Sequence, residues 1–443
     1  MKKRSSPPGA NADTKQDRQR LTVTIEEIGA QGDGIARVEG RKVHIPFVLP
    51  GETVTADLIG ARASLAAVER ASPDRIEPVC RHFGLCGGCA LQHWREAVYA
   101  DWKTELVRAS LAREGLDAPL EPLRSYPLAS RRRAVFTARK ANGHVSLGYN
   151  AARSHDLADL VECPILLPQI AAALPDLREA LAQALPNQGE AKVHITAAGN
   201  GLDCSIEAPR LMAQGLAKLT ALLPAAGLVR VTCNGEIAFL KAAPFILAGG
   251  VKVMLPEGAF LQAVEACERD MAAFVAEALA EARVASGPVC DLFAGLGAFT
   301  FSCAKTAPVA AFEENAAAVA ALSSAARSAA GIKPVKAVKR DLYRNPLGPV
   351  ELNAFAAAVA DPPREGAEAQ AKALAASKIG AAVMLSCNPV TFARDAAILA
   401  AAGFRLSRLA VFDQFKFSPH VEIAAAFVRA GSKKGRLAPA LAR

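Results

Sequence analysis

The chain has 443 residues and a formal net charge of +9 at pH 7, so we expect two or three domains and a polyanionic partner, nucleic acid first. Hydrophobic residues make up 51% of the chain, but no uninterrupted apolar stretch reaches the roughly 18–20 residues that a helical membrane span needs. The composition therefore argues against a helical membrane protein, and we expect a soluble, cytoplasmic chain without a membrane partner.

The first part of the chain combines a basic leader with a pattern of short strands. Residues 1–19 are basic and lack the apolar core of a secretory signal, so we expect a disordered leader. Residues 20–75 alternate apolar and polar positions, as in "LTVTIEEI", and contain Gly turns such as "GAQGDG". This pattern predicts a small OB-like β-barrel, which is either a stabilising domain or an RNA-binding one.

Residues 76–250 mix a helix, hairpins and cysteines, which predicts a small α+β domain. We expect a helix over about residues 93–115, and it can pack on the domain that follows. The segment "SRRRAVFTARKANGHVSLGYN" alternates on both sides of an expected turn at Ala141-Asn142-Gly143. Its basic residues predict a face for RNA, with a merely solvated surface as the alternative: Arg131, Arg132, Arg133, Arg139 and Lys140.

Four cysteines of this region form a spaced set. Three lie in "VCRHFGLCGGCALQHW" and one in "LVECPILLPQI": Cys80, Cys86, Cys89 and Cys163. Four thiolates suit either tetrahedral zinc or a cubane iron–sulfur cluster. The wide first gap and the distant Cys-Pro favour iron–sulfur, with a structural or RNA-positioning role.

Residues 251–430 alternate strands and helices, which predicts a doubly wound, Rossmann-like α/β domain. In "VCDLFAGLGAFTFSCA" a strand ends in an acid and two glycines precede a helix, and acids end the next two strands as well. Such a loop lets a ligand approach the backbone, and S-adenosylmethionine fits two glycines better than a dinucleotide does. A turn needed only for packing is the alternative. The candidate residues are Asp291, Gly295, Gly297, Glu313 and Asp341.

Two further strand ends carry reactive groups. "AVADPPREG" places Asp361 before a stiff Pro-Pro turn, but Arg364 stands where amino-methyltransferases have an aromatic residue. "AAVMLSCNPVT" places Cys387 at the cofactor edge of the sheet. A thiolate that adds to C6 of a pyrimidine activates C5 for methylation, and a base must then remove the C5 proton. Glu422, in "SPHVEIAAAF", is the available carboxylate.

These segments together resemble one known family. "DLFAGLGAFT", "ADPP", "LSCNPVTFARD" and "PHVEIAAAF", in this order and spacing, are similar to the uracil-C5 RNA methyltransferases. "GDGIA…IPFVLPGE" resembles the RNA-binding TRAM domain of that family, and the cysteine spacing resembles the iron–sulfur site of its 23S ribosomal RNA branch. The resemblance covers about residues 20–430 and leaves a short basic tail at residues 431–443.

The resemblance implies roles for individual residues. Cys387 would be the nucleophile and Glu422 the base, while Asp361 would hold the polar edge of the uracil and border the cofactor. In "GAFLQAV", Gln262 would contact the cofactor and Phe260 could stack on a displaced base. Val264 stands at the usual Asn position of that segment, which is a departure from the family pattern.

The implied protein has a TRAM barrel, a small iron–sulfur domain with a [4Fe–4S] cluster, and an S-adenosylmethionine-dependent methyltransferase domain. It would act as a monomer, bind a structured RNA such as 23S ribosomal RNA, extrude one uridine and methylate its C5. Two rivals stay open: an amino-methyltransferase that uses Asp361-Pro-Pro, and a non-catalytic RNA-binding or assembly factor.

Overall fold

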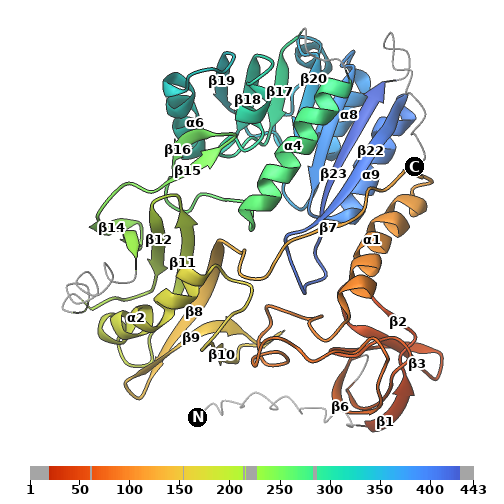
Figure 1. Cartoon of the computed structure of the whole chain (residues 1–443), viewed down its shortest axis with the longest axis vertical. Coiled ribbons are helices and arrows are strands. Elements are labelled where there is room, and N and C mark those ends of the chain that lie inside the picture. Colours follow the sequence, from red (N-terminus) through yellow and green to blue (C-terminus); the bar gives the residue numbers. More distant parts are fainter. Residues whose placement is uncertain are drawn as a thin grey trace, which may run out of the picture. The chain divides into compact units, whose positions relative to one another are not determined.

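The structure is a computed structural model that describes residues 19–59, 62–152, 154–212, 215, 227–282 and 287–429. The expected tail, and all of the expected leader except Gln19, lie outside these residues. Where we expect three domains, the chain forms two compact units: residues 1–77 with 90–95, and residues 78–89 with 96–443. Figure 1 shows the elements of both units in chain order. No helix among the described residues is long and apolar enough to cross a membrane.

The first unit is built on a six-stranded sheet in the order β1-β5-β6-β4-β3-β2. Alternating apolar residues such as Val43 and Ile45 point to one side and form its core with Val54. The buried Glu52 accepts hydrogen bonds from the Leu49 backbone N–H and from Arg75. The strands are β1 (Gln19–Thr24), β2 (Glu27–Ile28), β3 (Gly34–Val38), β4 (Arg41–Ile45), β5 (Thr53–Ile59) and β6 (Arg62–Arg70).

The second unit contains a seven-stranded sheet in the order β10-β9-β8-β11-β12-β13-β14, with helix α2 sharing its core. The predicted hairpin is confirmed, since Asn142 and Gly143 link β8 to β9 with φ of 52° and 83°, as a two-residue turn requires. The elements are β8 (Arg133–Ala141), β9 (His144–Asn150), β10 (Leu157–Asp159), α2 (Pro168–Ala184), β11 (Glu190–Ala198), β12 (Gly201–Glu207), β13 (Leu228–Cys233) and β14 (Glu236–Leu240).

The same unit contains an eight-stranded sheet in the order β19-β18-β17-β20-β21-β23-β22-β7. Its five strands from β19 to β21 are parallel, and β23 runs antiparallel to β21. The predicted Rossmann-like fold is confirmed. The strands are β7 (Arg124–Ser125), β17 (Val289–Leu292), β18 (Val309–Glu313), β19 (Val335–Lys339), β20 (Ala357–Ala360), β21 (Ala381–Ser386), β22 (Phe404–Asp413) and β23 (Glu422–Arg429).

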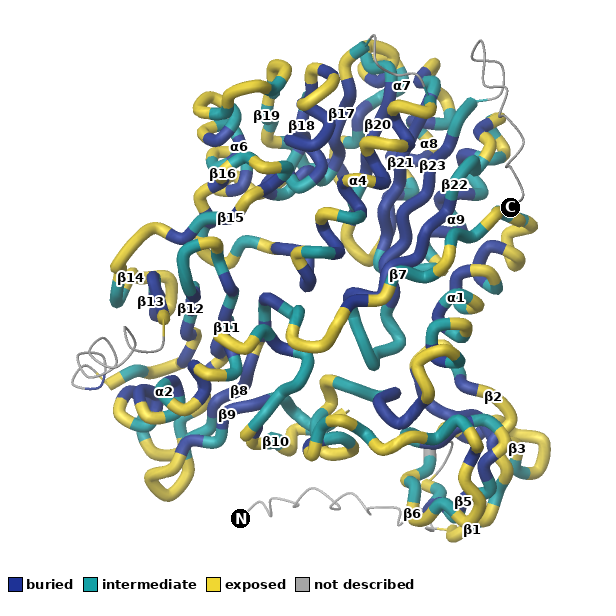
Figure 2. The backbone as a smooth tube through the Cα atoms, in the orientation of Figure 1, coloured by how far each residue is buried: buried dark blue, intermediate teal, exposed yellow. Residues whose placement is uncertain are grey.

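Helices cover both faces of this sheet, and Figure 2 shows its central strands buried along their length. Successive residues of a strand point to opposite faces, so Met384 packs in the cluster of α1, α8 and α9, while Val383 packs in that of α4 and α5. The helices are α1 (Glu96–Arg113), α4 (Glu265–Glu281), α5 (Thr300–Cys303), α6 (Ala316–Ser328), α7 (Pro349–Leu352), α8 (Glu368–Ala376) and α9 (Pro389–Ala401).

The chain passes between the two sheets of the second unit more than once. Helix α1 and strand β7 precede the seven-stranded sheet in sequence, yet α1 packs on α9 and β7 pairs with β22. After the seven-stranded sheet, the hairpin of β15 (Phe245–Ala248) and β16 (Val251–Met254) packs on α6. These crossings explain why both sheets fall in one compact unit.

Candidate active site

The strand ends of the eight-stranded sheet bring a thiol and two carboxyl groups together. Asp361 follows β20 and Cys387 follows β21, and these parallel neighbours end at the same edge of the sheet. Strand β23 runs the other way, with Ile423 opposite Ser386, so Glu422 begins that strand beside Cys387. The topology therefore places the expected nucleophile and base next to each other, although they lie far apart in the sequence.

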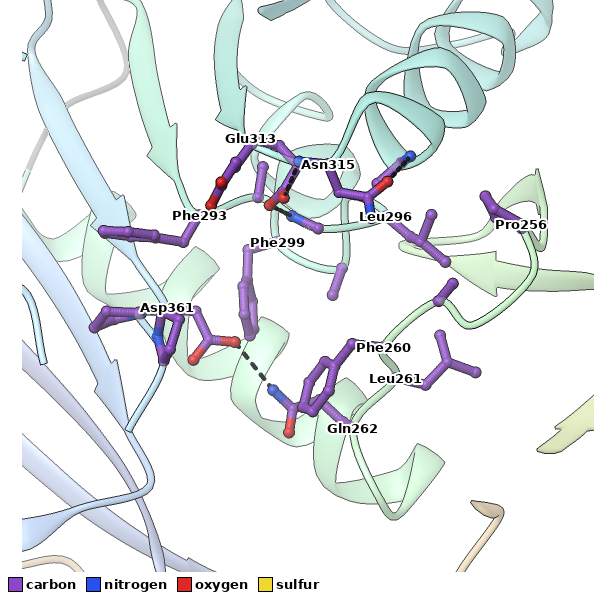
Figure 3. Close-up of a pocket in the computed structure, with 18 of the residues that line it drawn as sticks. Pro256, Phe260, Leu261, Gln262, Phe293, Leu296, Phe299, Glu313, Asn315 and Asp361 are labelled. Atoms are coloured by element: carbon purple, nitrogen blue, oxygen red, sulfur yellow. Dashed lines mark hydrogen bonds between the residues drawn. The ribbon is translucent and has the colours of Figure 1, made fainter. Parts of the chain in front are cut away.

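A cavity of about 570 Å³ lies at this edge, within the range of about 300–1,000 Å³ that is usual for small-molecule sites. Figure 3 shows its aromatic walls and the hydrogen bond between Gln262 and Asp361. Seven of the residues singled out from the sequence line this single space: Phe260, Gln262, Gly295, Glu313, Asp361, Cys387 and Glu422.

The glycine loop borders one end of the cavity. Gly295 and Gly297 both have positive φ, 54° and 88°, which favours glycine. A Cβ at Gly297 would lie 2.8 Å from the Phe301 ring, so that glycine serves packing and does not line the cavity. Gly295 has open space at its Cβ position and does line the cavity. The two glycines thus differ in role.

Glu313 closes the rim above this loop. Its Oε2 accepts a hydrogen bond from the Gly295 N–H at 2.9 Å, and its Oε1 accepts one from the Asn315 N–H at 2.8 Å. Asn315 in turn caps helix α6 through the N–H groups of Ala317 and Ala318. These contacts hold the carboxylate at the end of β18, where it faces the cavity (Figure 3).

The other two acids expected at the cofactor lie outside the residues that line the cavity. Asp291 is fully buried, accepts a hydrogen bond from the Thr300 hydroxyl, and has its pKa raised to about 7 by burial. Asp341 accepts hydrogen bonds from the N–H groups of Tyr343 and Arg344, at 3.0 Å each. Both acids therefore support the loops around the cavity from behind.

Several lining residues were missed by the sequence analysis. They surround the expected strand-end residues and supply aromatic surface, a guanidinium group and an amide: Phe293, Phe299, Asn315, Arg340 and Tyr343. Each lies within a few residues of a strand end that was recognised, so proximity to those ends is the signal that could have found them.

A buried chain of side-chain amides joins the two carboxyl groups. Gln262 donates from Nε2 to Asp361 Oδ2 at 3.0 Å, and Gln414 donates from Nε2 to Gln262 Oε1 at 2.7 Å. Gln414 also donates to Glu422 Oε1 at 3.0 Å. Gln414 has no sequence signal, because it follows a strand that carries no recognisable motif.

The reactive groups share an acidic, partly dry environment. Burial raises the pKa of Glu422 well above its usual value, and the nearby Asp361 raises it further. Burial likewise raises the pKa of Asp361. The pKa of the Cys387 thiol rises to about 11 through burial, with Glu422 and Asp361 adding to the rise. Burial and the two carboxyl groups therefore favour a neutral Cys387 thiol.

The three arginines expected to face RNA occupy different environments. Arg132 is buried, pairs with Glu268 at 2.5 Å, and donates from Nε to the Gln262 carbonyl at 2.9 Å. This internal role is at odds with an RNA contact, because a phosphate cannot reach it. Arg131 is half-buried, and its Nε donates to the Arg133 carbonyl at 3.0 Å.

Arg133 lies over the ring of Phe260, with 4.2 Å from the guanidinium carbon to the ring centroid. Burial lowers its pKa to about 10, and the charge of Glu422 opposes that fall. Phe260 lines the cavity and keeps 63% of its surface exposed. This pair therefore places a cation and an aromatic face beside the reactive groups.

The four expected cluster cysteines are half-buried and are not joined in disulfides. Burial raises the pKa of Cys163 to about 11, and nearby Cys80 and Cys86 add to the rise. Cys89 belongs to the same neighbourhood, since it, Cys86 and Cys163 all act on Tyr149. The donor set thus suits a metal cluster chemically. Even so, within the described ranges no group of three or more His, Cys, Asp or Glu side chains is arranged to hold a metal ion.

Two models of known protein families match the N-terminal and the C-terminal part of the chain. The family model described as tRNA (Uracil-5-)-methyltransferase matches residues 250–429, and the TRAM domain model matches residues 14–64. Among solved structures, the Pyrococcus abyssi tRNA (uracil-54, C5)-methyltransferase in complex with S-adenosyl-L-homocysteine is 20% identical with a TM-score of 0.70. That match covers 92% of this chain and 99% of the other, and it shows a shared fold.

Curated relatives match almost the whole chain. An uncharacterized RNA methyltransferase of Brucella suis is 45% identical over 408 residues, which cover 92% of this chain and 97% of that protein. The 23S rRNA (uracil(1939)-C(5))-methyltransferase RlmD of Halomonas elongata is 33% identical over 429 residues, covering 91% and 88%. The chain therefore belongs to the uracil-C5 RNA methyltransferase family, whose members are S-adenosylmethionine-dependent enzymes.

Proposed function

We propose that this chain methylates C5 of one uridine in 23S ribosomal RNA, with Cys387 as nucleophile and Glu422 as base. The observation that carries the proposal is the single cavity that joins Cys387, Asp361 and Glu422 to the Gly295–Glu313 rim. The choice of ribosomal RNA is supported by the Halomonas elongata relative, which is named as a 23S rRNA enzyme.

Cys387 begins the reaction. Its thiolate forms a bond to C6 of the uracil, and the electrons of the C5–C6 double bond move to the O4 oxygen. Asp361, whose raised pKa lets it keep a proton, can donate a hydrogen bond to the polar edge of the ring and so stabilise the enolate. S-adenosylmethionine, when bound, supplies the methyl group that C5 takes up, and the methyl–sulfur electron pair leaves with S-adenosylhomocysteine.

Glu422 completes the reaction. It removes the proton from C5, the electrons re-form the C5–C6 double bond, and the C6–sulfur bond breaks to release the Cys387 thiolate. A base must be ionised at the working pH yet basic enough to accept this proton. The raised pKa of Glu422 suits that task, because a carboxylate with a higher pKa is a stronger base.

The cavity also suits the proposed cofactor. The Gly295 loop allows close approach of a ligand, and Glu313 at the end of β18 can accept hydrogen bonds from ribose hydroxyls. The sulfonium group is a cation, and acidic residues at this edge favour it electrostatically. A cation close to Cys387 would also favour the thiolate, which burial and the nearby Glu422 and Asp361 disfavour.

The decisive experiment is nucleoside mass spectrometry on undermodified ribosomal RNA incubated with S-adenosylmethionine. We expect 5-methyluridine from the wild-type protein and from Cys303→Ala, a matched control at a buried cysteine of the same domain, but none from Cys387→Ala. Methyladenosine that survives Cys387→Ala would favour the amino-methyltransferase. Tight RNA binding without any product from wild-type protein would favour an assembly factor.

We further propose that Cys80, Cys86, Cys89 and Cys163 hold a [4Fe–4S] cluster with a structural or RNA-positioning role. The support is the four-thiol donor set and the proximity of these thiols to one another. Protein purified without oxygen should contain iron and sulfide, which Cys163→Ala should lose and Cys204→Ala, a buried cysteine of the core on which Cys163 packs, should retain. Stoichiometric zinc in place of iron would contradict the proposal.

The first unit is proposed to bind RNA as a TRAM domain, together with Arg131, Arg133 and Phe260 at the cavity. Arg132 is left out of this set because it is buried against Glu268. The support is the match of residues 14–64 to the TRAM domain model. Removing residues 1–75 should weaken RNA binding, while S-adenosylmethionine binding, measured by calorimetry, should persist.

A further inference from the structure

Gln414 occupies a buried position directly after β22, with only 3% of its surface exposed. Its Oε1 accepts hydrogen bonds from the N–H groups of Ala263 at 2.8 Å and Val264 at 3.3 Å. Its Nε2 donates to Gln262 and to Glu422. A primary amide has two N–H donors and one oxygen that accepts two hydrogen bonds, so every hydrogen-bonding position of Gln414 is used.

The orientation of this amide is fixed by its backbone partners. The N–H groups of Ala263 and Val264 can only donate, so they require the oxygen of Gln414 and turn its NH₂ group toward Glu422. The orientation of the Gln262 amide is fixed in the same way. Its Oε1 accepts a hydrogen bond from Gln414, so its NH₂ group must face Asp361. The two amides therefore deliver one N–H donor to each carboxyl group, and neither can flip alone without losing hydrogen bonds.

Both flanks of Gln414 are held in place. The preceding Asp413 is fully buried and binds Lys103 Nζ and, at 2.9 Å, the Tyr99 hydroxyl of helix α1. Lys103 also donates to the carbonyls of Phe415 at 3.2 Å and His420 at 2.7 Å. The loop between β22 and β23 is thus anchored on each side of Gln414, which leaves its amide little freedom.

The segment that contains Gln262 and Ala263 is held by Arg132, which directly precedes β8. Arg132 donates from its backbone N–H to the Ala263 carbonyl at 2.8 Å and from Nε to the Gln262 carbonyl at 2.9 Å. This segment contains Val264 at the position where the family pattern has Asn. The Gln414 side chain binds the backbone at that position, since its Oε1 accepts from the Val264 N–H.

We infer that Gln414 is a positioning residue for proton removal: it holds Glu422 by one oxygen, favours its ionised form, and leaves the other oxygen for the C5 proton. The inference rests on the proposed function, since it assigns the base to Glu422. A donor that binds a carboxylate stabilises the charged form. The charged and titratable groups that act on or with Glu422 are Asp361 from β20, Arg133 from β8, Cys387 from β21 and Cys267 from α4.

The test compares Gln414→Leu with Gln370→Leu under single-turnover conditions. Gln370 is also a buried amide, with two hydrogen bonds to the Leu347 backbone, but it lies outside the cavity lining. Unmodified ribosomal RNA and S-adenosylmethionine are mixed with enzyme, the covalent protein–RNA adduct is followed on denaturing gels, and 5-methyluridine is followed by mass spectrometry.

In Gln414→Leu we expect release from the adduct to slow by about 10- to 100-fold, as loss of one hydrogen bond to a charged group implies. Adduct formation should change less, so methylated adduct accumulates, and the pH profile of release moves to higher pH. Gln370→Leu should resemble the wild type. Equal slowing of formation and release, or an unmoved pH profile, would overturn the inference.

If Gln414→Leu fails to fold, release from the adduct is measured in Gln414→Glu instead. It keeps the shape but replaces the donor with an acid beside Glu422, so release should be at least as slow as in Gln414→Leu. Wild-type-like release in this variant would overturn the inference while 5-methyluridine formation still supports the proposed function. If wild-type enzyme forms no Cys387-dependent product, the proposed function fails and the inference fails with it.

Discussion

The acidic and the basic side of the active site handle buried charge in different ways. The acidic side consists of carboxyl groups at the cavity, Asp361 and Glu422, and of Asp291 within β17 behind it. Burial raises the pKa of all three. The basic side is the segment that leads into β8. There Arg132 is neutralised by Glu268, and Arg133 lies on the Phe260 ring.

The difference follows from the chemistry of the two groups. A buried carboxylate can take up a proton near neutral pH, whereas a guanidinium group keeps its charge and needs a partner. The acidic side can therefore change its protonation when a cation or a substrate arrives. The arginines of the basic side cannot change their protonation. Arg132 forms a rigid structural frame with Glu268, and only Arg133 lies at the cavity.

The largest effect is expected from the acidic side, when Glu422 is replaced by Gln. The amide keeps the shape but cannot remove the C5 proton, so turnover should fall by about 100- to 10,000-fold while the covalent adduct with RNA persists. Denaturing gels and 5-methyluridine quantification measure both. Glu365→Gln, an exposed change near the same sheet edge, should behave as wild type. Normal turnover in Glu422→Gln would mean that another group is the base.

On the basic side, Arg132→Met should leave Glu268 buried without its partner. The free energy of unfolding should fall by about 3–5 kcal/mol, the usual cost of breaking a buried pair, measured by urea denaturation. Arg139→Met, in the strand β8 that follows Arg132 and in a half-exposed pair with Glu190, should lose no more than about 1 kcal/mol. Equal losses would show that Arg132 is not part of the frame.

Sequence reasoning located the strand ends because their signals are local. A parallel sheet brings the ends of neighbouring strands to one edge, so Cys387, Asp361 and Glu313 could be placed there from their motifs alone. A cofactor contact of Asp291 stays a prediction, and the structure places this residue outside the cavity lining. That residue lies within β17 rather than after it, and its side chain is fully buried behind the glycine loop.

The rest of the site depends on contacts between distant parts of the chain. Gln262 and Gln414 are 152 residues apart, and neither lies in a pattern that predicts their hydrogen bond. The sequence does not predict the ion pair of Arg132 with Glu268 either. Its three consecutive arginines instead favour a surface that binds RNA. Burial decides the role of each arginine, and burial depends on how the two sheets pack.

The pH dependence of stability isolates the acidic side. The pKa of Asp291 is raised to about 7 when folded, against about 3.9 in an unfolded chain. A raised acid contributes stability below the unfolded pKa, and that contribution is lost as pH rises through the folded pKa. Asp291→Asn should therefore stabilise the unliganded enzyme at pH 8 relative to pH 4, by a few kcal/mol. Thermal unfolding at both pH values measures this.

A control variant and an outcome that would contradict the prediction complete the Asp291→Asn experiment. Asp101→Asn, at an exposed position of helix α1, should leave the difference between pH 4 and pH 8 unchanged. If Asp291→Asn also leaves it unchanged, Asp291 is ionised in the folded protein. Burial would then leave Asp291 charged. In this respect the acidic side would differ less from the arginines, which also keep their charge.

The smallest effect concerns Arg133, the part of the basic side that meets the cavity. A cation–π contact between Arg133 and an RNA base would be worth about 0.5–2 kcal/mol, so its loss in Arg133→Met should weaken RNA binding by about 2- to 30-fold. If Arg133 also meets a phosphate, the slope of log affinity against log salt should fall by about 1. Fluorescence anisotropy with a labelled RNA hairpin measures both. Arg133→Lys, which keeps the charge, should restore the slope more than the affinity.

Arg139→Met is the control for charge alone, because Arg139 is already paired with Glu190. An unchanged salt slope in Arg133→Met would assign Arg133 to the frame together with Arg132. The basic side would then be structural throughout, and the phosphate contacts would have to come from elsewhere, with the TRAM domain as the first place to look. A reduced slope would instead make the Arg133–Phe260 pair the point where the frame becomes an RNA contact.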